Sequence, residues 1–234
     1  NDVGINKFND IGSILLYSTY FGGSSSETPF ISRVNDLGQL TFGGTTTSTN
    51  LPITTGAFKA TKTGNRELFL AKLSEDGTQL LGATYFGNNT TLGTTFNLTA
   101  PSQANQTSNI LPGIEINFDD NNNIWFVCNT TDMTNVPTTS NAHQLAKNGG
   151  SDVVIVKFDP TLSNILYGSY LGGNGNESVH GIELMSNGNI VLVGGTTSTD
   201  FPIVGTNQHT QVPAAGQALN GYIVILDETS GQIT

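Results

Sequence analysis

The sequence predicts an all-β fold, and two observations lead to this prediction. The first is composition: 28 of the 234 residues are glycine and only 11% are charged, which is typical of short strands joined by polar turns. The second is an internal repeat, marked by an aromatic motif whose second tyrosine recurs at Tyr20, Tyr85 and Tyr170. These positions are 65 and 85 residues apart. Self-similarity over such distances indicates a repeat architecture.

Each repeat begins with a predicted hairpin. Two apolar segments flank a polar turn, which makes each pair an antiparallel unit. A Thr-rich loop follows and ends at Pro52, Pro137 or Pro202. The predicted hairpins comprise residues 30–34 with 40–44, 114–118 with 124–128, and 181–184 with 190–194.

A third and a fourth strand complete the predicted repeat. The third strand carries a lysine at Lys7, Lys72 and Lys157, whereas the last copy has Ile225. The fourth strand contains the aromatic motif and ends in Gly-Gly or, in the copy at 79–88, in Gly-Asn. The third strand is predicted at 4–8, 68–73, 153–158 and 222–226, and the fourth at 14–23, 79–88 and 164–173.

Four antiparallel strands in each repeat are typical of a β-propeller blade. The whole chain, 1–234, is therefore predicted to be a single propeller segment of about three blades. It divides into a part-blade 1–29, a blade 30–88, an insertion 89–112, a blade 113–173 and a part-blade 174–234. A closed propeller needs about four to eight blades, so we expect a segment of a longer protein.

The motifs of these strands resemble the bacterial seven-bladed β-propeller repeat family abbreviated SBBP. The resemblance rests on Leu-Tyr-Ser-Thr-Tyr-Phe-Gly-Gly at 16–23, Phe-Leu-Ala-Lys-Leu at 69–73 and Ser-Asn-Gly-Asn-Ile-Val-Leu-Val-Gly-Gly-Thr-Thr-Ser-Thr-Asp-Phe-Pro at 186–202. It covers nearly all of the chain except 89–112. It implies a large secreted or cell-surface bacterial protein, similar to adhesins, with an extracellular location.

Charge and composition exclude several classes of partner. The net charge of −10 and the scattered basic residues argue against nucleic acid. No apolar run approaches the ~18 residues of a membrane-spanning helix, so no membrane insertion is expected. Cys128 is the single cysteine and lies in an apolar run, which predicts a buried side chain. The acidic turn at 119–123 lacks the glycine and glutamate that an EF-hand loop requires, and no metal or cofactor is predicted.

The candidate ligand-binding residues lie in loops that precede the inner strands. Glu27 and Glu177 are 150 residues apart, as are Tyr20 and Tyr170, and they occupy equivalent positions. Asn174, Asn176 and His180 accompany Glu177. Such loops border one mouth of a propeller channel, where they can meet a ligand or a cation. The alternative is structural: the glutamates bind loop amides, because a position repeated in every blade usually serves the blade.

The function predicted from these features is that of a non-enzymatic structural or adhesive module of an exported bacterial surface protein. Its expected partners are other blades or domains of a longer chain, or other protein subunits. A carbohydrate- or small-ligand-binding propeller, which uses Glu177 and His180 or the 89–112 insertion, is the first alternative. A hydrolase or lyase with carboxylates at the channel mouth is the second, although the sequence contains no catalytic motif.

Overall fold

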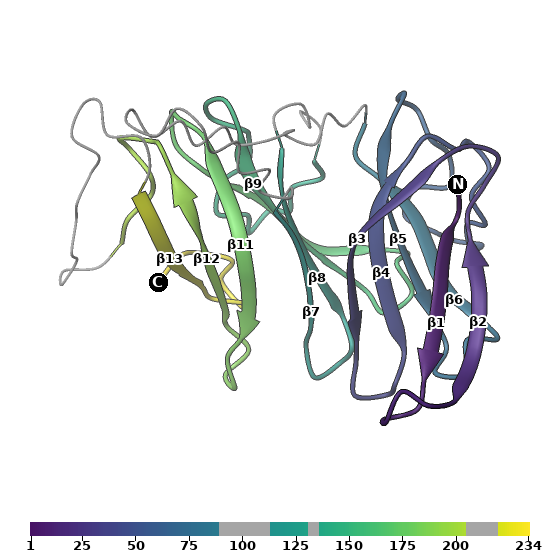
Figure 1. Cartoon of the computed structure of the whole chain (residues 1–234). Coiled ribbons are helices and arrows are strands. Elements are labelled where there is room, and N and C mark those ends of the chain that lie inside the picture. The colour runs from purple at the N-terminus through teal and green to yellow at the C-terminus, as the bar shows by residue number, and fades with distance from the viewer. Residues whose placement is uncertain (89–112, 131–135, 205–219) are drawn as a thin grey trace, which may run out of the picture. The chain divides into compact units, whose positions relative to one another are not determined.

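The computed structural model describes residues 1–88, 113–130, 136–204 and 220–234, and these residues form β-strands with no helix (Figure 1). The all-β prediction is therefore confirmed for the described part of the chain. The predicted insertion at 89–112 lies outside it. No described helix is long and apolar enough to cross a membrane.

The strands form antiparallel sheets whose order follows the chain. A two-stranded sheet contains β1 (Val3–Phe8) and β2 (Leu15–Phe21). A four-stranded sheet contains β3 (Glu27–Val34), β4 (Leu40–Thr46), β5 (Glu67–Leu73) and β6 (Leu80–Phe86). A second contains β7 (Ile114–Phe118), β8 (Ile124–Thr130), β9 (Asp152–Phe158) and β10 (Ile165–Leu171). A three-stranded sheet contains β11 (Glu177–Leu184), β12 (Ile190–Thr196) and β13 (Asn220–Leu226).

The chain divides into two compact units with separate cores. The first unit contains β1 to β6 together with residues 120–124 and 158–165. Its core is rich in aromatic rings, and Phe21, Phe42 and Phe69 pack with centroids 5.2 to 6.1 Å apart. The second unit contains most of β7 to β10 and all of β11 to β13. Trp125 and Tyr167 lie in its core, and β7 packs beside β11.

A β-bulge interrupts the first strand of two repeats at equivalent positions. The pairing of β3 with β4 shifts between Pro29 and Ile31, and that of β11 with β12 shifts between Val179 and Gly181. An extra residue breaks the alternation of inward and outward side chains. These two strands consequently begin earlier than the alternating pattern predicted, at Glu27 and at Glu177. The two glutamates lie in strands and not in the preceding loops.

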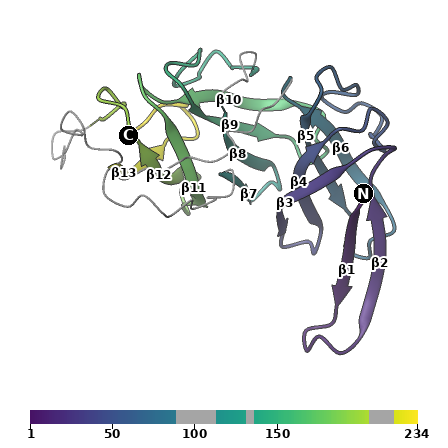
Figure 2. The ribbon, with the colours of Figure 1, turned by 45° about the horizontal axis from the view of Figure 1, so that its top comes forward.

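The second tyrosine of the repeated motif connects the Thr-rich loop to the fourth strand through hydrogen bonds. The buried hydroxyl of Tyr85 donates a hydrogen bond to the Ser48 carbonyl (3.1 Å) and accepts one from the Leu51 N–H (3.0 Å). Tyr170 is also buried, and its hydroxyl accepts a hydrogen bond from the Val136 N–H (3.2 Å). Both rings therefore have a structural role. Tyr20, by contrast, is 77% exposed on the β1–β2 hairpin, which projects beyond the sheet of β3 to β6 (Figure 2).

Candidate functional site

Glu177 is fully buried, and its carboxylate is bonded to the loops around it. One oxygen accepts a hydrogen bond from the Gly173 N–H (3.0 Å). The other accepts from the hydroxyls of Thr196 and Ser198. These donors satisfy the carboxylate within the protein, so Glu177 holds the start of β11 to the loop that follows β12.

Glu27 makes the equivalent contacts in the first unit. Its carboxylate accepts hydrogen bonds from the Thr46 hydroxyl (2.7 Å) and the Gly23 N–H (3.2 Å), and the side chain is buried. Thr46 and Gly23 correspond to Thr196 and Gly173 at the 150-residue offset. The shared contacts favour the structural interpretation of both glutamates.

Asn174 and Asn176 lie in the turn between β10 and β11 and bind the loop after β12. The Asn174 side chain donates a hydrogen bond to the Thr199 hydroxyl (3.0 Å), and its N–H donates to Asp200 (2.7 Å). The Asn176 N–H donates to the Thr197 hydroxyl (2.8 Å). The structure thus brings these two residues and Glu177 together. Their hydrogen bonds, however, connect one loop to another and do not form a binding site.

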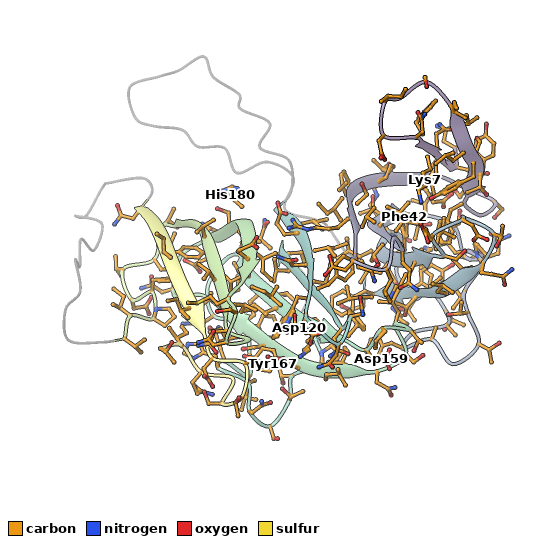
Figure 3. The ribbon with its side chains drawn as sticks, turned by 90° about the horizontal axis from the view of Figure 1, so that it is seen from below. Lys7, Phe42, Asp120, Asp159, Tyr167 and His180 are labelled. Carbon is orange, nitrogen blue, oxygen red and sulfur yellow. The ribbon has the colours of Figure 1, made fainter. Side chains whose placement is uncertain are left out.

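His180 is the extra residue of the bulge in β11. Its side chain is exposed, and Nε2 shares a 3.1 Å hydrogen bond with the Ser178 hydroxyl. Figure 3 shows His180 at the surface, whereas the labelled Tyr167 lies among the packed side chains. Of the five predicted site residues, Asn174, Asn176 and His180 are exposed, whereas Glu27 and Glu177 are buried. The bulge disrupts the strand pairing at His180.

The sequence prediction missed a carboxylate next to Glu177. Asp152 is the first residue of β9 and is fully buried. Its Oδ2 accepts hydrogen bonds from the Gln144 amide and the Asn148 N–H, both at 2.8 Å. Burial raises the pKa of Asp152, and the charge of Glu177 raises it further. The missed signal was an acidic residue repeated five positions before the repeated lysine, at Asp2, Glu67 and Asp152.

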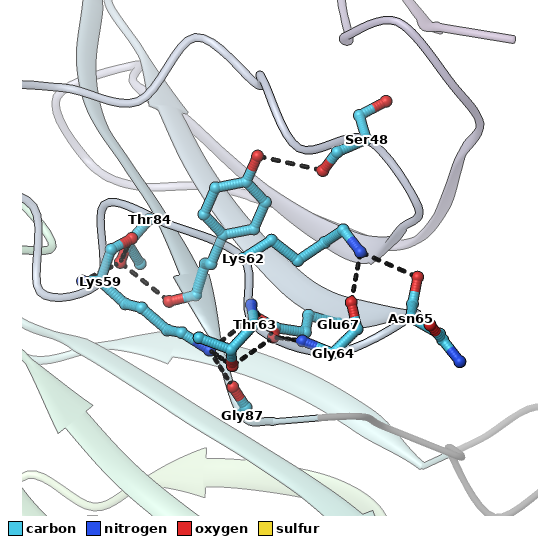
Figure 4. Close-up of polar contacts among 10 residues, drawn as sticks. Ser48, Lys59, Lys62, Thr63, Gly64, Asn65, Glu67, Thr84 and Gly87 are labelled. Atoms are coloured by element: carbon cyan, nitrogen blue, oxygen red, sulfur yellow. Dashed lines mark hydrogen bonds and ion pairs between the residues drawn. The ribbon is translucent and has the colours of Figure 1, made fainter.

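Glu67, the copy of this carboxylate in the first unit, is paired with a lysine (Figure 4). The Lys59 ammonium lies 2.7 Å from Glu67 Oε2, and it also donates hydrogen bonds to the Thr63 hydroxyl (3.1 Å) and to the Gly87 carbonyl. The other Glu67 oxygen accepts hydrogen bonds from the N–H groups of Thr63 and Gly64 (2.6 Å each). Glu67 is therefore neutralised by an opposite charge in the same unit.

In the second unit, two carboxylates surround the ammonium group of the buried Lys157. Its ammonium lies 2.7 Å from Asp119 Oδ2, contacts Glu228, and lies 5.3 Å from the centre of the Trp125 ring. Burial lowers the pKa of Lys157, but the hydrogen bonds and charges of the two carboxylates outweigh it, and the pKa is raised. The acidic turn predicted at 119–123 thus supplies a partner for a lysine. Asn122 in that turn has a φ of 60°, which an asparagine tolerates well.

The described residues contain no group of three or more His, Cys, Asp or Glu side chains arranged around a common point for a metal. Cys128 is buried as predicted, and burial raises the pKa of its thiol far above the ordinary value. No protein-family model matches the sequence, and neither does any curated protein. The SBBP resemblance therefore stays a prediction.

Ser198→Ala tests whether the cluster around Glu177 stabilises the fold. The Ser198 hydroxyl accepts the Gly175 N–H (2.8 Å) and donates to Glu177, so its removal leaves the Gly175 N–H without this acceptor and the buried Glu177 carboxylate with one donor fewer. We expect the free energy of unfolding to fall by about 2 kcal/mol, measured by urea denaturation. Thr199→Ala, at the exposed neighbour, is the control and should change it by less than about 0.5 kcal/mol. Equal effects of the two substitutions would contradict the structural role.

Proposed function

We propose that the chain is a segment of a β-propeller that serves as a non-enzymatic structural or adhesive module of an exported bacterial surface protein. Three features support the propeller. The strand order of β3 to β6 recurs in β7 to β10, and β11 to β13 follow it in part. The first strands of successive sheets, β7 and β11, lie side by side in the second unit. Equivalent glutamates make equivalent loop contacts.

The observation that carries the proposal is the unequal burial of three equivalent tyrosines. Tyr85 and Tyr170 are 0% and 2% exposed beneath the Thr-rich loop of their own sheet, whereas Tyr20 is 77% exposed. Among the residues that the structure describes, the sheet of β1 and β2 contains the third and fourth strands of a repeat but not the strand pair and loop that would cover Tyr20. We infer that two further strands of the same repeat pattern pair with the free edge of β1.

The polar groups support a structural role over a catalytic one. Asp152 and Glu177 are the pair of carboxylates that a hydrolase would require, but both are fully buried and no substrate can reach them in this structure. Glu177, the centre of the glycan-binding alternative, is likewise occupied by loop donors. His180 alone does not supply the groups that a hydrolase or a glycan-binding site requires.

The test compares Tyr20→Ala with Tyr85→Ala. In the 234-residue chain, Tyr85→Ala is expected to lower the free energy of unfolding by about 3–5 kcal/mol, whereas Tyr20→Ala lowers it by less than about 0.5 kcal/mol. In the polypeptide isolated at its natural length, Tyr20→Ala should become as destabilising as Tyr85→Ala. The intact mass of that polypeptide should far exceed 24.6 kDa if the added strands belong to the same chain.

Two results would contradict the proposal. One is a small effect of Tyr20→Ala on the free energy of unfolding of the natural polypeptide. Such a result would mean that no further strands pair with β1 and cover Tyr20. The other concerns location: protease treatment of intact cells should cleave a surface protein, and complete protection would argue against export.

A further inference from the structure

The third strand of each repeat carries an apolar residue two positions before the repeated lysine or its replacement at 225. These residues are Ile5 in β1, Leu70 in β5, Ile155 in β9 and Ile223 in β13. Successive residues of a strand point to opposite faces of the sheet. We call the face with these four side chains the front face of each sheet. The opposite face, which carries Phe69 in β5 and Tyr222 in β13, is the back face.

In both units, the front face of one sheet packs on the back face of the sheet that follows it. In the first unit, Ile5 lies in the same core as Phe69. Phe21 of β2 belongs to this core too, and its ring stacks on Phe69 with the centroids 5.4 Å apart. In the second unit, Ile155 lies in the same core as Tyr222. The repeat therefore specifies one kind of contact between sheets, front to back.

The front face of the sheet β11 to β13 is exposed. Ile223 is 76% exposed, whereas its counterparts Leu70 and Ile155 are 0% exposed. Val193 in β12 pairs with Ile223 and is 38% exposed, whereas its counterpart Val127 in β8 is fully buried. Positions that lie in a core in the preceding sheets thus face solvent here.

This exposed face is also more apolar than a solvent-facing sheet surface normally is. Val191 and Ile225 form the next pair on the same face, and both are half-buried. Ile225 stands where the other third strands have a lysine. A sheet face that meets water is usually polar, and a contiguous apolar patch indicates a contact surface.

The sheet of β1 and β2 has the complementary feature, an exposed back face. Gly4 and Tyr20 pair on this face, and a Cβ atom on Gly4 would lie 3.7 Å from the Tyr20 ring. Tyr20 is 77% exposed, whereas its counterpart Tyr85 is buried in the same core as Ile5. One end of the repeat therefore presents a front face, and the other end presents a back face.

We propose that the front face of β11 to β13 binds the back face of β1 and β2 in a second copy of this chain. The contact continues the front-to-back packing present in both units. Ile223 of one copy meets Tyr20 of the second copy, in the way that Ile5 shares a core with Tyr85. The inference rests on the repeat of the proposed propeller, but not on its export or its surface location.

The geometry determines the kind of assembly. Two different faces meet, so a dimer keeps one free face of each kind and adds a third copy unless its ends meet in a ring. Two strands against three make a small contact, below about 1,200 Å², so we expect a dissociation constant on the order of 10–100 μM. The chain is therefore monomeric in dilute denaturation experiments. Each copy has a net charge of −10, so NaCl should strengthen the association.

Sedimentation equilibrium of the 234-residue chain tests this proposal. Its average mass should rise above 24.6 kDa as the concentration increases from about 1 μM to about 500 μM. Ile223→Lys and Tyr20→Lys each alter one face, and each variant should stay at 24.6 kDa. Both lysines make the chain less acidic, so charge repulsion cannot explain the loss. Leu145→Lys, at a 66% exposed side chain outside these strands, is the control and should associate like the unmodified chain.

A mixture of the two variants is the decisive sample. Ile223→Lys retains the back face and Tyr20→Lys retains the front face, so one intact contact remains between them. An equimolar mixture should form a dimer of two 24.6 kDa chains and nothing larger. Formation of this dimer also shows that both variants are folded.

Three results would overturn the proposal. A chain that stays monomeric at the highest concentration would leave the front face to a further repeat or to another protein. Association that persists in either single variant would mean that other surfaces meet. A mixture that does not dimerise would show that the two faces are not partners. All three concern the association of the 234-residue chain, whereas the proposed function is tested by Tyr20→Ala in the natural polypeptide, so the two failures are distinguishable.

Discussion

Gly194→Ala is expected to lower the free energy of unfolding by about 3 kcal/mol, because a methyl group has no room at this position. A Cβ atom on Gly194 would lie 1.9 Å from the backbone oxygen of Ser178 and 2.5 Å from the Tyr222 hydroxyl. These two groups are joined by a 2.8 Å hydrogen bond, which the methyl group would disrupt. The bulge at His180 directs the Ser178 carbonyl at β12, so relief would require movement of the backbone. Urea denaturation of the purified variant measures the loss.

Gly221→Ala is the matched control in the neighbouring strand of the same sheet. The nearest heavy atom to a Cβ on Gly221 is 3.8 Å away, an ordinary contact distance. This substitution should leave the stability unchanged or raise it slightly, because glycine weakens a strand interior. The same steric conflict recurs at Gly44, where a Cβ would lie 2.1 Å from the Thr28 carbonyl oxygen, so Gly44→Ala should resemble Gly194→Ala. Similar stabilities for Gly194→Ala and Gly221→Ala would contradict the close approach.

The repeat in the sequence was sufficient to predict the strands and their order, because alternation and turn residues are local signals. It failed where pairing is irregular. The bulges at Phe30 and His180 shift the phase of the side chains, so the residues before them resembled loop sequence and Glu27 and Glu177 were placed outside the strands. Bulges depend on the register of two strands, and a single strand's pattern does not reveal that register.

The candidate site was predicted only in part, for a related reason. Glu177 was recognised because it has a copy at Glu27, but its neighbour Asp152 lies 25 positions earlier in a different sheet. The pair forms because the N–H of Glu177 bonds to the Ser151 carbonyl (2.7 Å), a contact between the starts of two strands. Likewise, the sequence showed that Lys7, Lys72 and Lys157 are equivalent. It could not show which of them is buried between carboxylates, since that depends on neighbours distant in sequence.

Lys157→Met is expected to lower the free energy of unfolding by about 3–5 kcal/mol at pH 7, because it leaves the buried Asp119 carboxylate without its cation. The Asp119 and Lys157 side chains are only 7% and 10% exposed. Methionine keeps an unbranched apolar side chain at this position, so the loss reports charge more than packing. Because the folded-state pKa of Lys157 is raised above its ordinary 10.5, the stabilisation is complete below about pH 10.5 and is lost as the pH rises through the raised value. Urea denaturation at pH 7 measures the loss, and its repetition above pH 10.5 measures the pH dependence.

Two companion variants decide whether the buried pair is the cause. Lys7→Met alters the equivalent lysine, whose ammonium lies 3.9 Å from the exposed Glu75, and it should cost less than about 1 kcal/mol. Asp119→Asn combined with Lys157→Met should recover most of the loss, because no uncompensated charge then remains in the interior. A loss that is independent of Asp119 would instead show that Lys157 stabilises the sheet through its contact with Trp125.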